Sequence, residues 1–202
     1  MDSQITADDR ERIEAGIRKK YIEVAKSPAN QFEYPTGKKG LEVLHYDKTL
    51  IHELPAAVAS SYCGVGNIFS MGNINRGERI LDIGCGAGVD AILAAIIVGP
   101  KGSVIGLDIV PEMIIRAENN LQMMDLDNVS FQKVSGENLP FPDKAFDVVI
   151  SNGVINLIPD KEAAMSEILR VLKPAGRLIM ADQIDAGGIQ KDIKARLANW
   201  FQ

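Results

Sequence analysis

The stretch Arg79-Ile80-Leu81-Asp82-Ile83-Gly84-Cys85-Gly86-Ala87-Gly88-Val89-Asp90 decides the fold. An apolar run ends in an acid, three glycines follow at every second position, and a helical pattern then begins. This order predicts a strand, a tight turn and a helix at about 87–98. Because glycine accepts positive φ and has no Cβ, a ligand can approach the turn closely. The helix would direct its free N–H groups and positive dipole end at that ligand.

The spacing separates this turn from other nucleotide-binding loops. A dinucleotide fingerprint needs glycine at position 89, which is Val89 here, and no Gly-Lys-Ser or Gly-Lys-Thr ending of a phosphate loop follows. A second apolar run, 103–108, also ends in an acid, Asp108, which lies 24 residues after Gly84. In a βαβ unit an acid at this point meets ribose hydroxyls, so we expect Asp108 to accept two hydrogen bonds from a cis-diol. Taken alone, the glycines are also compatible with a plain strand–helix connection.

Strand and helix patterns alternate along the second part of the chain. We expect strands at about 79–83, 103–108, 129–133, 146–151 and 177–182, helices at about 87–98, 111–123 and 160–172, and a turn at 172–176. This alternation predicts an α/β fold with a doubly wound, mostly parallel sheet and right-handed crossovers. We assign residues 1–75 to an N-terminal helix and cap segment, and residues 76–202 to the ligand-binding domain.

The N-terminal segment begins with one clear helical pattern. Thr6-x-x-Asp9 resembles a capping box, and Ile13, Ile17 and Tyr21 share a helical face, so we expect a helix at about 7–26. This helix either docks on the sheet or caps the site, with Tyr21 near the substrate.

Residues 27–75 give a weaker signal. They are rich in loop-forming residues, with a short helix expected at about 55–60, and suit a lid or an acceptor pocket. His45 and His52 lie in this stretch and are candidate general bases, although an isolated histidine is more often a surface or packing residue.

The Asp82-x-Gly84-x-Gly86-x-Gly88 pattern resembles motif I of the class I S-adenosylmethionine-dependent methyltransferases, and residues 136–141, 146–152 and 169–178 resemble later stretches of that family. The resemblance covers about 62–184 and implies S-adenosyl-L-methionine as cofactor. In the family the glycine loop wraps the methionyl part, an acid binds the ribose, and a loop after the third strand holds the adenine. The cofactor-binding residues implied are Asp82, Gly84, Gly86, Gly88, Asp108, Ile109, Gly136, Glu137 and Asn152.

One position departs from the family at the adenine end. Many members carry an acid where this chain has Ser135, so Glu137 or a backbone carbonyl would replace that contact.

Residues 149–161 and 64–67 resemble the arsenite methyltransferase-like branch, which is itself close to quinone-ring methyltransferases. The branch binds arsenic through cysteine thiols, but Gly153 and Val65 stand at two of those positions, with Cys63 two residues from the second. Because a soft metalloid needs several converging thiolates, an unidentified small-molecule acceptor is favoured over arsenite. The catalytic residues stay unknown, and the weak candidates are Tyr21, Asn152 and Asn156.

Two other classes of function compete with this one. The first is a cofactor-binding module without catalysis of its own, perhaps acting in a complex with a partner. The second, a nicotinamide-dependent oxidoreductase, is disfavoured by Val89.

Composition limits the classes of partner. The 202 residues carry a net charge of −5, which argues against nucleic-acid binding. Two cysteines imply no disulfide framework, and no His, Cys and carboxylate group has metal-ligand spacing, so we expect no metal. Without a run of about 18 apolar residues or a signal peptide, we expect a cytoplasmic protein and no membrane partner.

The predicted strand 177–182 raises a question about its edge. The family sheet has the order 3-2-1-4-5-7-6, but only a helix at about 189–201 follows the fifth strand here. An exposed apolar edge strand has unpaired N–H and C=O groups that can pair with another chain. We therefore expect this edge to be covered by the helix, by a second copy in a homodimer, or by a continuation of the chain.

Overall fold

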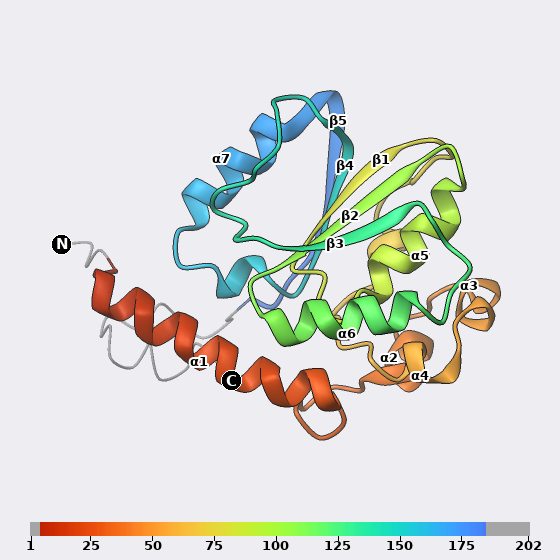
Figure 1. The fold of residues 1–202 in the computed structure, drawn as a ribbon, viewed down its shortest axis with the longest axis horizontal. Coiled ribbons are helices and arrows are strands. Elements are labelled where there is room, and N and C mark those ends of the chain that lie inside the picture. The colour runs from red at the N-terminus through yellow and green to blue at the C-terminus, as the bar shows by residue number, and fades with distance from the viewer. Residues whose placement is uncertain (1–4, 185–202) are drawn as a thin grey trace.

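A five-stranded parallel sheet organises the computed structural model, which describes residues 5–184. Its order is β3-β2-β1-β4-β5, so the expected class I order is confirmed for the strands present (Figure 1). The strands are β1 (Arg79–Ile83), β2 (Ser103–Asp108), β3 (Val129–Lys133), β4 (Phe146–Asn152) and β5 (Leu172–Ala181). In the register, Asp82 pairs with Gly106 on one side and Ile150 on the other, which places it in the middle of the sheet.

Helices cover both faces of the sheet, as a doubly wound fold requires. Helices α5 (Val89–Val98) and α6 (Pro111–Leu121) pack on one face, and α7 (Lys161–Val171) packs on the other. Both faces of β1 are therefore apolar, since Ile80 points into the α5 side and Leu81 into the α7 side, each fully buried. This is why the strand reads as a continuous apolar run.

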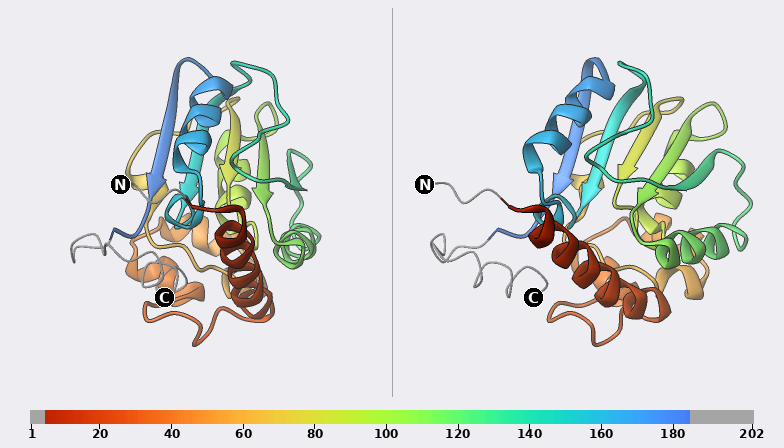
Figure 2. Two further views of the ribbon diagram at one scale, coloured as in Figure 1. Left: turned by 90° about the vertical axis from the view of Figure 1, so that its left-hand side faces the viewer. Right: turned by 60° about the vertical axis from the view of Figure 1, so that its left-hand side comes forward.

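Helix α1 (Ala7–Lys26) begins and ends where the sequence predicts. The side-chain oxygen of Thr6 accepts from the backbone N–H of Asp9 at 3.1 Å, and the Asp9 carboxylate accepts from the N–H of Thr6 at 3.2 Å, which confirms the capping box. Two of its apolar residues, Ile13 and Ile17, are buried against the start of α6. Figure 2 shows α1 lying across the carboxyl ends of the strands.

The stretch 27–75 is more helical than expected. It contains α2 (Gly37–Val43), α3 (Lys48–Glu53), α4 (Ala56–Ala59) and the 3-10 turn η1 (Ile68–Ser70), where only the helix near 55–60 was predicted. These elements are too short to repeat an apolar pattern. They are held instead by burying Leu41, Val58 and Ile68 in the core that α5 shares.

Two boundaries correct the prediction. The helix after the glycines begins at Val89 rather than Ala87, because Gly88 adopts a left-handed conformation (φ 80°) and caps it. Strand β5 begins at Leu172 rather than Arg177, and the predicted turn at 172–176 is an irregularity within the strand, where Ala175 has φ 63°. The helix predicted at 189–201 lies outside the described residues.

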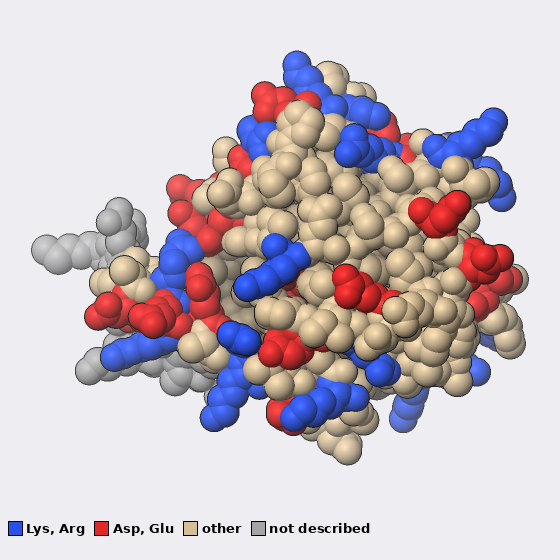
Figure 3. All heavy atoms as spheres, viewed as in Figure 1, with Lys and Arg blue, Asp and Glu red and all other residues tan. Residues whose placement is uncertain are grey.

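The outer surface shows charges of both signs. In the space-filling view, acidic and basic side chains alternate along α1, and no single sign dominates the face shown (Figure 3). Within the described residues, no helix has the length and apolar character needed to cross a lipid bilayer.

Candidate functional site

The carboxyl edge of the sheet holds a cavity of about 580 Å³, here called the main cavity. Its walls come from the glycine loop (residues 84–88), the ends of β1, β2 and β4, the loop after β3, and one face of α1. The predicted residues that line it are Tyr21, Asp82, Gly84, Gly86, Asp108, Ile109, Gly136, Glu137 and Asn152. Gly88 and Asn156 do not line it. Residues spread over most of the chain thus meet in one place.

The three glycines of the loop serve different purposes. A Cβ on Gly84 would collide with Val154, and one on Gly88 would lie 2.6 Å from Cζ of Phe131, so these two permit close packing. A Cβ on Gly86 would meet no atom nearer than 3.9 Å. Since Gly86 lines the main cavity, it leaves space there for a ligand to approach the backbone.

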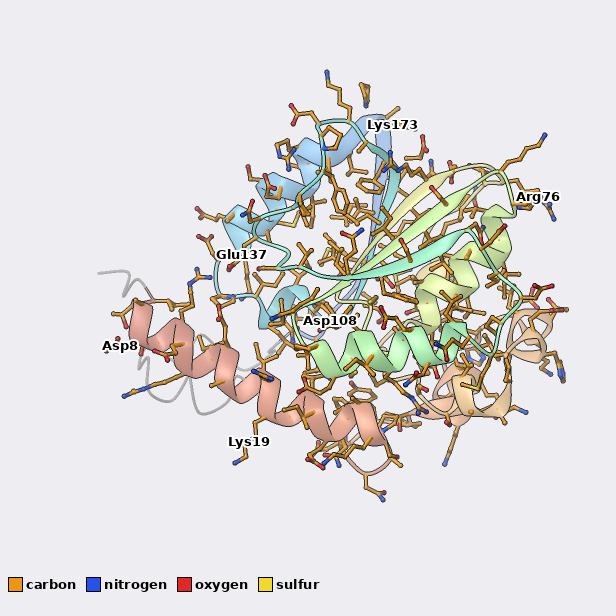
Figure 4. All side chains as sticks on the ribbon, in the orientation of Figure 1. Asp8, Lys19, Arg76, Asp108, Glu137 and Lys173 are labelled. Atoms are coloured by element: carbon orange, nitrogen blue, oxygen red, sulfur yellow. The ribbon has the colours of Figure 1, made fainter. Side chains whose placement is uncertain are left out.

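Asp108 holds the glycine loop from the end of β2. Its Oδ2 accepts from the N–H of Gly86 at 3.0 Å and its Oδ1 from the N–H of Val110 at 2.9 Å. Burial raises the pKa of this carboxyl to about 6, while these N–H groups act in the opposite direction. Figure 4 shows Asp108 at the carboxyl end of β2, next to the first turn of α6. Its remaining lone pairs are available to a diol.

Asp82 is the least satisfied polar group of the site. Its side chain lies on β1, is 2% exposed, and has a buried Oδ2 without a hydrogen-bond partner among the residues described. Burial raises its pKa well above the usual range, and the charges of Asp90 and Asp108 raise it further. A cation placed beside Asp82 would satisfy this oxygen and reverse the unfavourable electrostatics.

Glu137, the candidate contact for the adenine ring, already has partners within the protein. Its carboxylate forms an ion pair with Arg10 of α1, and its Oε1 accepts from the N–H of Asp160 at 2.7 Å. Glu137 lies on the loop that faces the N-terminal half of α1 (Figure 4). Ser135, two residues earlier, lines the main cavity as well. The ion pair therefore fastens α1 over this end of the cavity.

Asn152, a candidate from sequence, has its carboxamide fully hydrogen-bonded within the protein. The Oδ1 accepts from the N–H groups of Val65 and Gly66 at 2.9 and 3.1 Å. The Nδ2 donates to Gly66 O at 2.8 Å and to Oδ2 of Asp90 at 2.9 Å. Asp90 also accepts from the Tyr46 hydroxyl at 2.8 Å, and burial raises its pKa to about 6.

Sequence reasoning missed Asp90 and Tyr46. Asp90 lies in the first turn of the predicted helix, where an acid is common. The available signal was its position directly after the glycine loop, inside an otherwise apolar segment.

A second cavity of about 620 Å³ adjoins the main one. Both are lined by Tyr21 and Gly153, and the second also by Phe32 and Tyr34, whose rings stack at 4.9 Å. Asn156 lines it too, and its Oδ1 is buried without a partner among the described residues. The second cavity therefore offers aromatic and amide surface next to the main cavity.

Of the remaining candidates, the two histidines lie away from both cavities, whereas the two cysteines line the main cavity. His45 and His52 are both exposed and line neither cavity. Cys63 lines the main cavity, where burial raises the pKa of its thiol to about 12, and Cys85 is buried within the glycine loop. In the described part of the chain, no group of three or more His, Cys, Asp or Glu side chains converges to hold a metal ion.

Comparisons with known proteins agree with this geometry. A family model described as a methyltransferase domain matches residues 74–202. The chain is 39% identical over 159 residues to an arsenite methyltransferase of Halobacterium salinarum, which covers 79% of this chain and 40% of that protein. It is 32% identical over 142 residues to a demethylmenaquinone methyltransferase of Lactobacillus johnsonii, covering 63% of this chain and 58% of that protein.

Among solved structures, the arsenic(III) S-adenosylmethionine methyltransferase of Chlamydomonas reinhardtii matches with a TM-score of 0.56 at 32% identity. That match covers 74% of this chain and 50% of the other. The chain thus spans between two fifths and three fifths of the length of these relatives.

Proposed function

This chain belongs to the methyltransferase domain family, and we propose that it binds S-adenosylmethionine in the main cavity and transfers its methyl group to a small organic acceptor. The observation that carries the proposal is the buried Oδ2 of Asp82 beside the glycine loop, which has no hydrogen-bond partner within residues 5–184. A ligand with a carboxylate, an ammonium group and a diol fits this arrangement. The ammonium group suits Asp82, the carboxylate suits the start of α5, and the diol suits Asp108.

Bound S-adenosylmethionine supplies a methyl group on a positively charged sulfur. The chain's own contribution is to orient that group and exclude water from it. Ile17 and Tyr21 of α1 line both cavities, so they cover the region where the two meet. Gly153, with φ 77° and no side chain, also lines both cavities.

The tyrosine and cysteine side chains that line the two cavities keep their protons at neutral pH. Burial raises the pKa of the Tyr21 and Tyr34 hydroxyls, and that of the Cys63 thiol to about 12. At neutral pH none of these groups accepts a proton from the acceptor. The acceptor therefore presents a free electron pair, or releases its proton to solvent before it attacks the methyl carbon.

An organic acceptor is favoured over arsenite by the absence of sulfur at two facing positions. A Cβ on Gly153 would lie 3.3 Å from Cγ1 of Val65, and both residues line the second cavity. These are the positions where the arsenite-binding branch carries thiols, so this wall is apolar where a metalloid needs soft ligands. The stacked rings of Phe32 and Tyr34 suit a flat organic molecule instead.

A cofactor-binding module without its own catalysis is the alternative. For either function we propose a homodimer. The same site residues serve both functions, so only turnover separates them.

The decisive experiment is calorimetric titration with S-adenosylmethionine, S-adenosylhomocysteine and NAD, followed by a screen for transfer of labelled methyl groups. We expect both adenosyl compounds to bind and NAD not to bind. Binding of NAD alone would refute the proposal, and binding without transfer to any acceptor would favour the module.

A further inference from the structure

Residues 62–66 form the wall between the two cavities. Cys63 and Gly64 line the main cavity, whereas Val65 lines the second. The segment has no helix or strand of its own. Its conformation must therefore be fixed by contacts made from outside it.

Those contacts converge on one side chain at the end of β4. The carboxamide of Asn152 accepts from two successive N–H groups of the segment, those of Val65 and Gly66, and donates to the carbonyl of Gly66. Its second N–H donates to Asp90 in the first turn of α5. Both acceptor and both donor positions of the amide are thus used, three of them on the segment.

A buried hydroxyl pair supports the same arrangement. The Tyr46 and Tyr62 hydroxyls lie 3.0 Å apart and each lies 3.0 Å from the carbonyl oxygen of Gly66. The Tyr46 hydroxyl also donates to Oδ1 of Asp90. Because each hydroxyl has one proton, Tyr46 donates to Asp90 while Tyr62 donates to the carbonyl of Gly66, and Asp90 thereby holds Asn152 and Tyr46 together beside the segment.

The glycines of the segment are explained by this contact. A Cβ on Gly64 would collide with Nδ2 of Asn152 and lie 2.6 Å from the Tyr62 hydroxyl, and a Cβ on Gly66 would lie 2.5 Å from Cβ of Ala181. Neither glycine has positive φ, so close approach rather than backbone conformation requires them. The segment Gly64-Val65-Gly66 can therefore pack closely around the carboxamide of Asn152.

We infer that Asn152 is a positioning residue, which clamps residues 62–66 as the partition between the cofactor site and the second cavity. That residues 62–66 separate a cofactor site from the second cavity rests on the proposed function. That Asn152 holds these residues in place does not. A ligand contact by the carboxamide would need one of these bonds to break. Asn152 therefore acts through Val65 and Gly66 rather than on the reacting atoms.

The test compares variants that break the clamp with one that removes a structural asparagine elsewhere. Asn152→Ala removes the carboxamide, Gly64→Ala pushes it away, and Tyr46→Phe removes one hydroxyl while keeping the ring. The control is Asn128→Ala, because Asn128 also donates two hydrogen bonds, to Ala95 O and Gly99 O, but lines neither cavity.

Two measurements report on the segment itself. The first is amide hydrogen exchange of Val65 and Gly66, referenced to the β1 amide of Ile83. The second is alkylation of Cys63 by iodoacetamide, with peptide mapping to separate it from Cys85. We expect both rates to rise at least tenfold in Asn152→Ala and Gly64→Ala and about threefold in Tyr46→Phe. Asn128→Ala should lower the melting temperature and change both rates less than twofold.

Equal rates in wild type and the clamp variants would overturn the inference, as would an equal rise in Asn128→Ala. If Asn152→Ala does not fold, Gly64→Ala and Tyr46→Phe decide, and unchanged rates in both would overturn it. Calorimetry with S-adenosylhomocysteine separates the two proposals. A chain that fails to bind this compound, yet shows fast exchange only in the clamp variants, would refute the proposed function and keep the clamp.

Discussion

Replacing Asp108 by asparagine tests the site sharply, because it removes one charge and one acceptor oxygen while keeping the shape of the side chain. The carboxylate accepts from Gly86 and Val110, and burial raises its pKa from 3.8 to about 6. The folded chain therefore binds this proton more tightly than the unfolded chain. Its contribution makes the free energy of unfolding decrease as pH rises from about 4 to about 6.

The size of the effect follows from the shift. A change from 3.8 to about 6 is about 2 pH units, and at 1.36 kcal/mol per unit it corresponds to about 3 kcal/mol, absent near pH 4 and complete above about pH 7. Asparagine has no such charge, but offers one acceptor oxygen where two N–H groups need one each. The unpaired N–H costs about 1–3 kcal/mol at any pH.

We therefore expect Asp108→Asn to be less stable than wild type at pH 4 and equally or more stable at pH 8. Urea denaturation at the two pH values measures this difference. At pH 8 the affinity for S-adenosylmethionine should fall about tenfold to a hundredfold, as calorimetry would detect. The exposed Asp127→Asn is the matched control. A stability difference that is the same at both pH values would refute the electrostatic reasoning, and unchanged affinity would remove Asp108 from the site.

Three further predictions address other parts of the molecule. Gly86→Val should abolish cofactor binding in calorimetry, because the side chain enters the open space of the main cavity, while circular dichroism stays native; the positive φ of Gly86 (52°) should also lower the melting temperature, and normal binding would leave the loop a structural turn. The natural chain should not methylate arsenite at a useful rate, whereas Gly153→Cys with Val65→Cys should create arsenite binding, since the two positions face each other; robust methylation by the natural chain would contradict this. Finally, β5 pairs only with β4 among the described strands, so we expect a homodimer in light scattering at several concentrations, and a strict monomer would be evidence against edge pairing.

The proposed cofactor site in the main cavity could be predicted from sequence because its signals are local. Asp82 and the glycines are neighbours in the chain, and Asp108 follows at the distance that one helix imposes. The capping box of α1 likewise lies within four residues, and both its start and its end were predicted. Such signals need no knowledge of distant contacts.

The second cavity, the proposed acceptor site, could not be predicted in the same way. Tyr21, Phe32, Val65 and Gly153 come from four separate segments, and only the packing of α1 and the cap brings them together. The short helices of 27–75 carry too few turns for an apolar period to emerge. The clamp joins Asn152 to Gly66 and Val65, which lie 86 and 87 positions earlier in the sequence. The sequence around either partner therefore gives no indication of the contact.

The charges of the main cavity give a physical reason for the kind of ligand it selects. Asp82 and Asp90 are buried and Asp108 is partly buried, desolvation raises the pKa of each, and none of them forms an ion pair with the basic side chains described. Such a cluster of carboxylates without ion pairs is destabilising in the free protein, as the raised pKa of Asp108 illustrates. A cationic ligand offsets that cost on binding, whereas an anionic dinucleotide would increase it. The same carboxylates should hold the positively charged sulfonium cofactor more tightly than the uncharged thioether left after transfer, which favours product release.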